Sequence, residues 1–400
     1  MDNRYMPPML MGEELTKGLS VLPPYAPNIR DASTSERLIE LARLYDVYLP
    51  SPMTEEIYCK LYLALLRSLQ KKQTKVATTQ GNINRQGISN GIIGGSDSFT
   101  ILGLSGIGKS SAISRAISLI APQSLIVTTE PYSRIAPIIT VQTPYDCSVK
   151  GLLLEILRET DKALGTDYHS HAIRARASTD ALIGSVANVC LHSVGLLILD
   201  EFQNVCGKNG ANLMGVLLNL INSSGISVAL VGTLETKAFF SEASFQLSRR
   251  SLGLEYGNLP LGEYFINLCR VLTSYLYVRN DFSLTDDIVH WLYQHSNGIT
   301  SVVVSLIKDA QELAILDGSE ALSITSLNKA YEQRLALLHN HINIKTIKHT
   351  PIKKSVSTIE TVLDMPIEAY IETIVGNIKK NGGNLIDLLR EQIQILEVRL

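Results

Sequence analysis

The sequence predicts an α/β protein in which a parallel β-sheet carries helices on both faces and is followed by an all-helical domain. A glycine-rich loop joins a short apolar strand to an amphipathic helix within residues 99–120. A second apolar run, at 194–201, has no polar alternation and ends in two acidic residues, which is typical of a strand buried on both faces. After about residue 258 the apolar residues recur only at helical spacing.

The N-terminal part is expected to lie outside the sheet. Residues 1–33 are rich in proline and lack periodicity, so we expect a flexible arm. Residues 34–97 are expected to form a helical region and a linker. One helix begins near Thr34 and another is capped by Thr54. The polar, glycine-rich stretch 71–98 is interpreted as the linker, or as a loop on the adenine side of a nucleotide.

Residues 98–258 are expected to form the nucleotide-binding core, because strands and helices alternate along them. This alternation predicts a parallel sheet with right-handed crossovers. The predicted strands are 99–102, 125–128, 138–143, 194–200 and 227–231, with a last strand after 250, and the predicted helices are 109–120, 149–164, 179–192 and 212–222.

Two helical segments follow the core. Residues 259–338 carry four apolar stripes and are expected to form a helical lid. Residues 339–400 are expected to form a basic linker and an amphipathic tail of two short helices. Such a short helical hairpin buries little apolar surface alone, so we expect it to pack on the body or to dock on a partner.

The glycine-rich loop has the spacing G-x-x-x-x-G-K-S. Backbone N–H groups at the start of the following helix can bind β- and γ-phosphates, so ATP and Mg²⁺ are the expected cofactors. Lys109 adds a positive charge, and the hydroxyl of Ser110 can ligate Mg²⁺. The alternative, a Gly/Ser-rich turn without a ligand, fits the flanking strand and helix less well. The expected nucleotide contacts are Gly103, Leu104, Ser105, Gly106, Ile107, Gly108, Lys109, Ser110, Ser111 and Asp200.

The two acids that end the apolar run are candidates for the chemistry of hydrolysis. Asp200 can hold Mg²⁺ through water, and Glu201 can act as the general base that polarises the attacking water. Alternatively, Asp200 caps the next helix. ATP binding with hydrolysis, which would make the protein an ATPase, is the better interpretation because the phosphate-binding loop precedes these acids.

Further residues are candidates for contacting the γ-phosphate. Thr233 follows a strand expected beside the acidic one, so its hydroxyl can reach the phosphate or the attacking water; alternatively it is a helix N-cap. Arg249 and Arg250 precede the last strand, where an arginine of one subunit can stabilise the transition state on its neighbour. The alternative is that both arginines are solvated surface residues.

Composition excludes several classes of protein. Of the 400 residues 45% are hydrophobic, yet no apolar run approaches the ~18–20 residues of a membrane span. The N-terminus lacks a signal-peptide pattern, so we expect a cytoplasmic protein without a membrane partner. Five cysteines without C-x-x-C spacing argue against a disulfide framework and a zinc site. With a net charge of −2, any DNA contact must come from a local basic face, or from many weak contacts repeated in an oligomer.

Several segments besides the phosphate-binding loop resemble one known family. They are 143–152, 164–168, 200–205, 230–233, 245–253 and 297–315. With these segments the chain resembles the TnsC family of AAA+ ATPases over about residues 30–335. This family regulates transposons that pair a DDE transposase with a separate target selector. Position 301 is serine where many AAA+ lids carry arginine, and this family also tends to lack that arginine.

The resemblance implies an AAA+ P-loop NTPase core with a C-terminal lid and a role in DNA transposition. Such a protein assembles with ATP as a hexamer- or heptamer-like ring or a helical filament on duplex DNA. It links a TniQ-type target selector to the transposase, and in some systems to an accessory endonuclease, while hydrolysis controls disassembly. Both protein-directed and guide-RNA-directed (CRISPR-associated) target selection fit it. The residues that match the family's DNA contacts are Lys150 and Thr166.

Two alternatives from other classes remain open. One is an AAA+ loader or remodelling ATPase that acts on a protein partner and holds no DNA in its pore. The other is a signalling switch driven by nucleotide binding. A net charge close to zero is compatible with both, and stimulation of the ATPase by duplex DNA would separate them from the transposition regulator.

Overall fold

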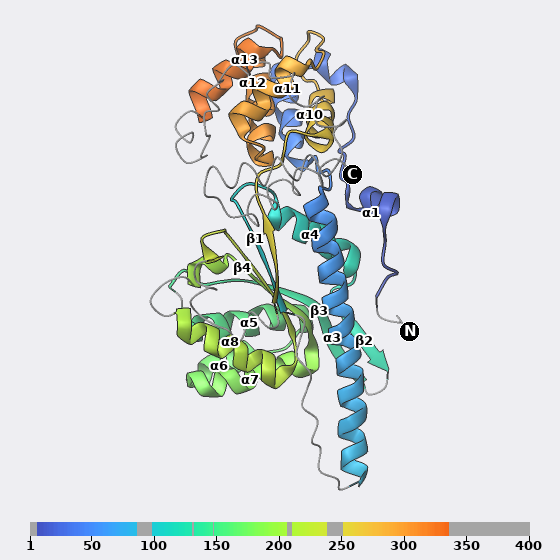
Figure 1. Cartoon of the computed structure of the whole chain (residues 1–400), viewed down its shortest axis with the longest axis vertical. Coiled ribbons are helices and arrows are strands. Elements are labelled where there is room, and N and C mark those ends of the chain that lie inside the picture. The colour runs from blue at the N-terminus through green and yellow to red at the C-terminus, as the bar shows by residue number, and fades with distance from the viewer. Residues whose placement is uncertain are drawn as a thin grey trace, which may run out of the picture. The chain divides into compact units, whose positions relative to one another are not determined.

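The structure is a computed structural model in which residues 6–85, 98–129, 132–146, 148–205, 210–237 and 251–335 are described. The chain divides into two compact units, Met1–Ile344 and Lys345–Leu400. The described residues all belong to the first unit, shown in Figure 1. The expected basic linker and amphipathic tail, 339–400, lie outside the described residues.

A mostly parallel sheet forms the centre of the first unit. Among the described residues it has six strands in the order β2-β3-β4-β5-β1-β6. Strand β1 pairs in parallel with β5 and β6, and β4 pairs in parallel with β3 and β5. The α/β fold class expected from the sequence is therefore confirmed. The strands are β1 (Ser98–Gly103), β2 (Ile126–Thr129), β3 (Tyr132–Gln142), β4 (Val194–Asp200), β5 (Ser227–Gly232) and β6 (Ser251–Tyr256).

One strand departs from the expected parallel sheet. Strand β2 pairs antiparallel with β3, from Ile126 opposite Ile135 to Thr129 opposite Tyr132. Strand β3 begins at Tyr132 and not at residue 138, so only two residues separate the two strands. A parallel crossover needs about a dozen residues, so this short connection requires a hairpin.

Helices cover both faces of the sheet, as Figure 1 shows. Alternate residues of β4 explain why its sequence is apolar throughout: Leu197 and Leu199 join one core cluster, and Leu196 and Ile198 join the other. The first face is covered by α5 (Val149–Leu164), α7 (Thr179–Ser193) and α8 (Gly210–Ser224), with α6 (Tyr168–Arg174) packed on α5. The second face is covered by α3 (Pro52–Arg85) and α4 (Lys109–Ile120).

The N-terminal segment differs from the expected flexible arm. It contains α1 (Gly12–Leu19), whose Leu15 and Leu19 are buried in the same cluster as helix α4. It continues through η1 (Pro27–Asp31), α2 (Thr34–Leu41) and η2 (Ala42–Asp46). Helix α3 also continues to Arg85, through most of the stretch expected to be a polar linker. Tertiary packing of Leu15 and Leu19 thus outweighs the weak local periodicity.

The expected helical lid follows β6. Its helices are α10 (Glu263–Ser274), α11 (Asp286–Ser296), α12 (Thr300–Leu316) and α13 (Ile324–Ala330), followed by a π-helical turn η4 (Tyr331–Leu335). They enclose a third hydrophobic cluster, and Leu41 and Leu44 of the N-terminal segment belong to it. Among the described residues, none of the helices combines the length and the apolar character that crossing a membrane requires.

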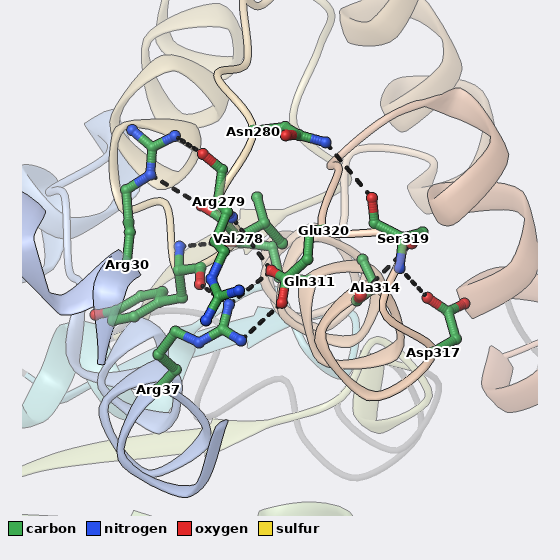
Figure 2. A network of polar contacts seen from close by, with 11 residues as sticks. Arg30, Arg37, Val278, Arg279, Asn280, Gln311, Ala314, Asp317, Ser319 and Glu320 are labelled. Carbon is green, nitrogen blue, oxygen red and sulfur yellow. Dashed lines mark hydrogen bonds and ion pairs between the residues drawn. The ribbon is translucent and has the colours of Figure 1, made fainter. Parts of the chain in front are cut away.

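An ion pair between a buried arginine and a partly buried glutamate connects the N-terminal segment to the lid (Figure 2). Arg37 of α2 is 1% exposed, and its Nη1 and Nη2 donate to the two carboxylate oxygens of Glu320 at 2.6 and 2.7 Å. The Arg279 N–H donates to the same carboxylate at 3.2 Å. Arg37 also donates to the Tyr277 carbonyl at 3.1 Å, while Arg30 donates to the Val278 carbonyl at 2.9 Å. We call this cluster of Arg37, Glu320 and the Tyr277 and Arg279 backbone the Arg37 junction.

Candidate nucleotide-binding site

Three neighbouring strands bring the predicted site residues together. Strands β1, β5 and β4 are adjacent and parallel, and they end at Gly103, Gly232 and Asp200. Their carboxyl ends therefore meet at one edge of the sheet, where open α/β sheets bind ligands. A pocket of about 260 Å³ lies there, lined by Ser105, Gly106, Gly108, Lys109, Ser110, Ser111, Asp200, Glu201, Gln203, Gly232, Thr233 and Ser301.

The glycine-rich loop has the conformation that its glycines allow. Gly106 and Gly108 have φ angles of +82° and +93°, in the left-handed region that side chains disfavour. Helix α4 begins at Lys109, and its N-cap Gly108 gives no side-chain cap. The first N–H groups of the helix are thus open to an anion such as a phosphate. Of the predicted contacts, Gly103, Leu104 and Ile107 shape the loop but do not line the pocket.

Lys109 places its ammonium group inside this loop. Its Nζ donates to the Gly103 and Leu104 carbonyls at 2.8 Å each. Burial lowers the pKa of Lys109, while the negative charges of Asp200 and Glu201 act in the opposite direction. A partly desolvated cation held at a helix N-terminus attracts a phosphate more strongly than a fully solvated one would.

Ser110 and Asp200 face each other across the pocket. The Ser110 hydroxyl donates to Asp200 Oδ2 at 3.4 Å, and Asp200 Oδ1 accepts from the Glu201 N–H at 2.8 Å. A hydroxyl beside a carboxylate fits the oxygen ligands of Mg²⁺. Among the described residues, no three His, Cys, Asp or Glu side chains are grouped to hold a metal, so Mg²⁺ bound here would also need phosphate oxygens.

Glu201 has a strained backbone. Its φ is +54°, an uncommon conformation for a residue with a side chain that costs of order 1–3 kcal/mol. The side chain is exposed in the pocket, and its Oε2 accepts a hydrogen bond from Gln203 Nε2. The Gln203 Oε1 accepts from the Thr233 N–H at 3.3 Å. Sequence reasoning missed Gln203; its place two residues after the predicted base was the available signal.

Thr233 follows directly after β5 and lines the pocket. Its Oγ1 is buried and has no hydrogen-bond partner among the described residues. A helix N-cap would use this oxygen to accept an N–H, so the structure does not support the N-cap alternative for Thr233. Buried hydroxyls normally have partners, and one left open toward a pocket fits a site that binds a polar ligand. The residues present therefore fit ATP with Mg²⁺.

One part of the chain matches the model of a known domain family. Residues 94–239 match the model of the AAA domain. This AAA domain contains the loop, the two acids and Thr233. No curated protein matches the chain.

Solved structures of similar fold share little sequence with the chain. The ORC2 protein of Aeropyrum pernix (ADPNP-ADP complexes) is 19% identical at a TM-score of 0.41, over 60% of this chain and 62% of that one. The ORC1 protein of the same organism, in complex with DNA, is 15% identical at 0.41, over 66% and 64%. A RuvB variant of Thermotoga maritima is 13% identical at 0.37, over 70% and 68%. The chain thus spans less than two thirds of either ORC protein, and likeness at this level transfers no function.

The lid contacts the AAA domain at the phosphate-binding loop. The Gly106 carbonyl accepts from the Ser301 N–H and from the Thr300 hydroxyl, both at 3.2 Å. Both donors belong to the first turn of α12, and Ser301 also lines the pocket. The helical segment after β6 therefore contributes a serine and a helix N-terminus to this pocket.

The remaining predicted residues lie away from this pocket or outside the described residues. Lys150 is exposed in the first turn of α5, as the sequence predicts. The Thr166 hydroxyl donates to Asp161 Oδ1 at 2.6 Å, so it already forms a hydrogen bond within the turn that follows α5. The DNA contacts of Lys150 and Thr166 stay predictions. Arg249 and Arg250 lie outside the described residues.

Proposed function

We propose that the protein is an ATPase of the AAA+ class that uses ATP and Mg²⁺ in the pocket of its AAA domain. The observation that carries the proposal is the buried Thr233 hydroxyl, without a partner among the described residues, in a pocket that also holds Lys109, Ser110, Asp200 and Glu201. A cation, a metal-binding pair, a base and a spare donor in one pocket are the groups that phosphoryl transfer to water needs.

Each side chain has a distinct role in this proposal. The first N–H groups of α4 and Lys109 bind the β- and γ-phosphates. Ser110 would hold Mg²⁺ directly and Asp200 would hold it through water, and the bound ion would supply positive charge at the phosphate oxygens. Glu201 accepts a proton from the attacking water. The oxygen of this water bonds to the γ-phosphorus while the bond between the γ-phosphorus and the β–γ bridging oxygen breaks. The Thr233 hydroxyl donates a hydrogen bond to the γ-phosphate or to the attacking water.

Two substitutions separate binding from hydrolysis. Lys109→Ala removes the cation at the phosphates and should weaken binding of fluorescent ATP by at least about 10- to 100-fold. Glu201→Gln keeps the shape of the side chain but removes the base, so it should bind ATP normally and hydrolyse it about 10²- to 10⁴-fold more slowly. Tight ATP binding by Lys109→Ala, or normal turnover by Glu201→Gln, would exclude the proposed roles.

We further propose that this ATPase regulates DNA transposition. It assembles with ATP as a hexamer- or heptamer-like ring or a helical filament on target duplex DNA. It links a TniQ-type target selector to the transposase and, where present, an accessory endonuclease. Hydrolysis of ATP then controls disassembly. The support is the resemblance of several segments to the TnsC family and the exposed Lys150 at the N-terminus of α5, where a phosphate contact is favoured.

The DNA contact is tested by removing one exposed lysine at a time. Lys150→Ala should weaken ATP-dependent binding to duplex DNA and make its salt dependence shallower, because each subunit loses a phosphate contact. Lys17→Ala, which removes an equally exposed lysine of α1, should leave both unchanged. An unchanged salt slope in Lys150→Ala places the DNA contact elsewhere. If duplex DNA neither binds nor stimulates the ATPase, the protein-remodelling alternative gains support.

An arginine acting between subunits is part of the same proposal. One of Arg249 and Arg250 is proposed to reach the nucleotide of the neighbouring subunit. Protein carrying Arg249→Ala or Arg250→Ala lacks one half of a shared site, and Lys109→Ala protein lacks the other. Mixing the two should restore part of the ATPase activity. If no mixture recovers activity, neither arginine acts in trans.

A further inference from the structure

We propose that Gln203 is a positioning residue that holds the Glu201 carboxylate and connects it to Thr233. The inference rests on the proposed hydrolysis of ATP in this pocket. Gln203 lies in η3 (Phe202–Val205), immediately after the two acids that end β4, and its side chain lines the pocket. Its Nε2 donates to Glu201 Oε2, and its Oε1 accepts from the Thr233 N–H at 3.3 Å. One side-chain amide therefore connects the carboxyl ends of β4 and β5.

The partners of Gln203 determine the orientation of its amide. An ionised carboxylate can only accept hydrogen bonds, and a backbone N–H can only donate one. The NH₂ group must therefore face Glu201, and the carbonyl oxygen must face Thr233. The opposite orientation would bring two acceptors together on one side and two donors together on the other. Asparagine and glutamine are the side chains that present a donor and an acceptor from one planar group.

Glu201 needs such a restraint. The residue is exposed and its backbone is strained, and among the described residues the only hydrogen bond recorded for its carboxylate comes from Gln203. A glutamate side chain has three rotatable bonds, so an unrestrained carboxylate would be poorly placed toward the attacking water. With Oε2 bound to Gln203, Oε1 is left to accept the proton.

The backbone beside Thr233 leaves room for this amide. A Cβ added to Gly232 would lie 3.2 Å from Gln203 Oε1 and 2.9 Å from Thr236 Oγ1. Glycine at this position thus lets the glutamine approach β5 closely.

The test uses variants of Gln203 and a neighbouring amide as the control. Gln203→Leu removes both hydrogen bonds and should lower kcat about 10- to 100-fold while the Kd for ATP changes less than about threefold, because a charged hydrogen bond at the base is lost. Gln203→Glu keeps the shape but places a second carboxylate beside Glu201, which should shift the acid limb of the kcat–pH profile to higher pH. Asn204→Ala, in the same turn, loses a hydrogen bond to the Thr143 carbonyl and should leave kcat unchanged.

A double substitution shows whether Gln203 acts through Glu201 or independently of it. In the Glu201→Gln background, Gln203→Leu should cause no further loss of kcat, because the base that it positions is already absent. If Gln203→Leu does not fold, Gln203→Glu and its pH profile carry the test, since glutamate has the same size.

The experiments distinguish an error in the proposed hydrolytic site from an error in the proposed role of Gln203. If Glu201→Gln hydrolyses ATP like the parent protein, the proposed hydrolytic site is wrong. If Glu201→Gln is inactive while Gln203→Leu has the parent kcat, or Gln203→Glu has the parent pH profile, only the role of Gln203 is overturned.

Discussion

Two glutamates of this protein adopt the same unusual backbone conformation in different surroundings. Glu201 in the pocket and Glu320 in the Arg37 junction have φ angles of +54° and +53°. The Glu320 carboxylate accepts two hydrogen bonds from Arg37 and one from the Arg279 N–H. The Glu201 carboxylate is exposed and accepts one from Gln203. The ion pair thus offsets the backbone strain at Glu320, whereas Glu201 keeps a similar strain with one carboxylate oxygen left open.

The largest expected difference between the pocket and the Arg37 junction is in the change of stability when each glutamate is replaced by glutamine. Glu320→Gln leaves the Arg37 guanidinium without a counter-charge, and because Glu320 is only partly buried it should lower the free energy of unfolding by about 1–3 kcal/mol. Glu201→Gln, at an exposed position, should change it by less than about 0.5 kcal/mol. Urea denaturation measures both. In a double-mutant cycle, adding Arg37→Met to Glu320→Gln should recover part of the loss, and strict additivity would contradict a coupled pair.

The second largest expected effect is a loss of stability at low pH. The Arg37 guanidinium lowers the pKa of Glu320, and Arg334 and Lys308 lower the pKa of Glu312 to about 2. Both groups have folded-state pKa values below their unfolded values. They therefore add stability above about pH 4.3, which is lost as the pH falls through their folded-state pKa values, about 2 for Glu312. Urea midpoints measured from pH 7 to pH 3 should fall in the parent protein, and the fall should be smaller in Glu320→Gln.

Two neighbouring threonines allow an unpartnered hydroxyl with a proposed role in hydrolysis to be compared with one that has no such role. The hydroxyls of Thr233 and Thr236 are both buried and unpartnered within the described part of the chain, but only Thr233 lines the pocket. Thr236→Val removes a group that is costly to bury, so it should raise stability by about 1 kcal/mol with unchanged hydrolysis. Thr233→Val should slow hydrolysis about tenfold, since one hydrogen bond to the reacting groups is lost. Equal hydrolysis by the two variants would exclude a role of Thr233 at the phosphate.

The smallest expected effect tests the strain itself. Glycine adopts a positive φ without a steric penalty, so Glu201→Gly should raise the free energy of unfolding by up to about 1 kcal/mol although hydrolysis is lost. Glu320→Gly relieves the same strain but removes the ion pair, so it should destabilise the protein. Thermal unfolding of the two variants should therefore shift in opposite directions. A shift in the same direction would contradict the difference between the two glutamates.

The sequence predicted the pocket well because its residues follow a local rule. Carboxyl ends of adjacent parallel strands meet, so the loop after β1, the acids after β4 and Thr233 after β5 were each recognisable from their own strand. Helix α5 has the bounds that its spacing predicted. The packing of α1 on α4 and the Arg37 junction were missed, since nothing in the local pattern around Arg37 indicates a partner 283 residues away. Gln203 was missed because its role depends on two side-chain contacts that only the folded strands create.

The separation between Arg37 and Glu320 also has a consequence for synthesis. A ribosome that adds about 5–20 residues per second needs about 15–60 s to reach Glu320 after it has made Arg37, which lies 283 residues earlier. The sheet is complete once Tyr256 has left the ribosome, but Leu41 and Leu44 still lack the lid helices on which they pack. During that interval the nascent chain presents an apolar segment and an unpaired arginine, a combination that molecular chaperones and proteases encounter before the lid closes over it.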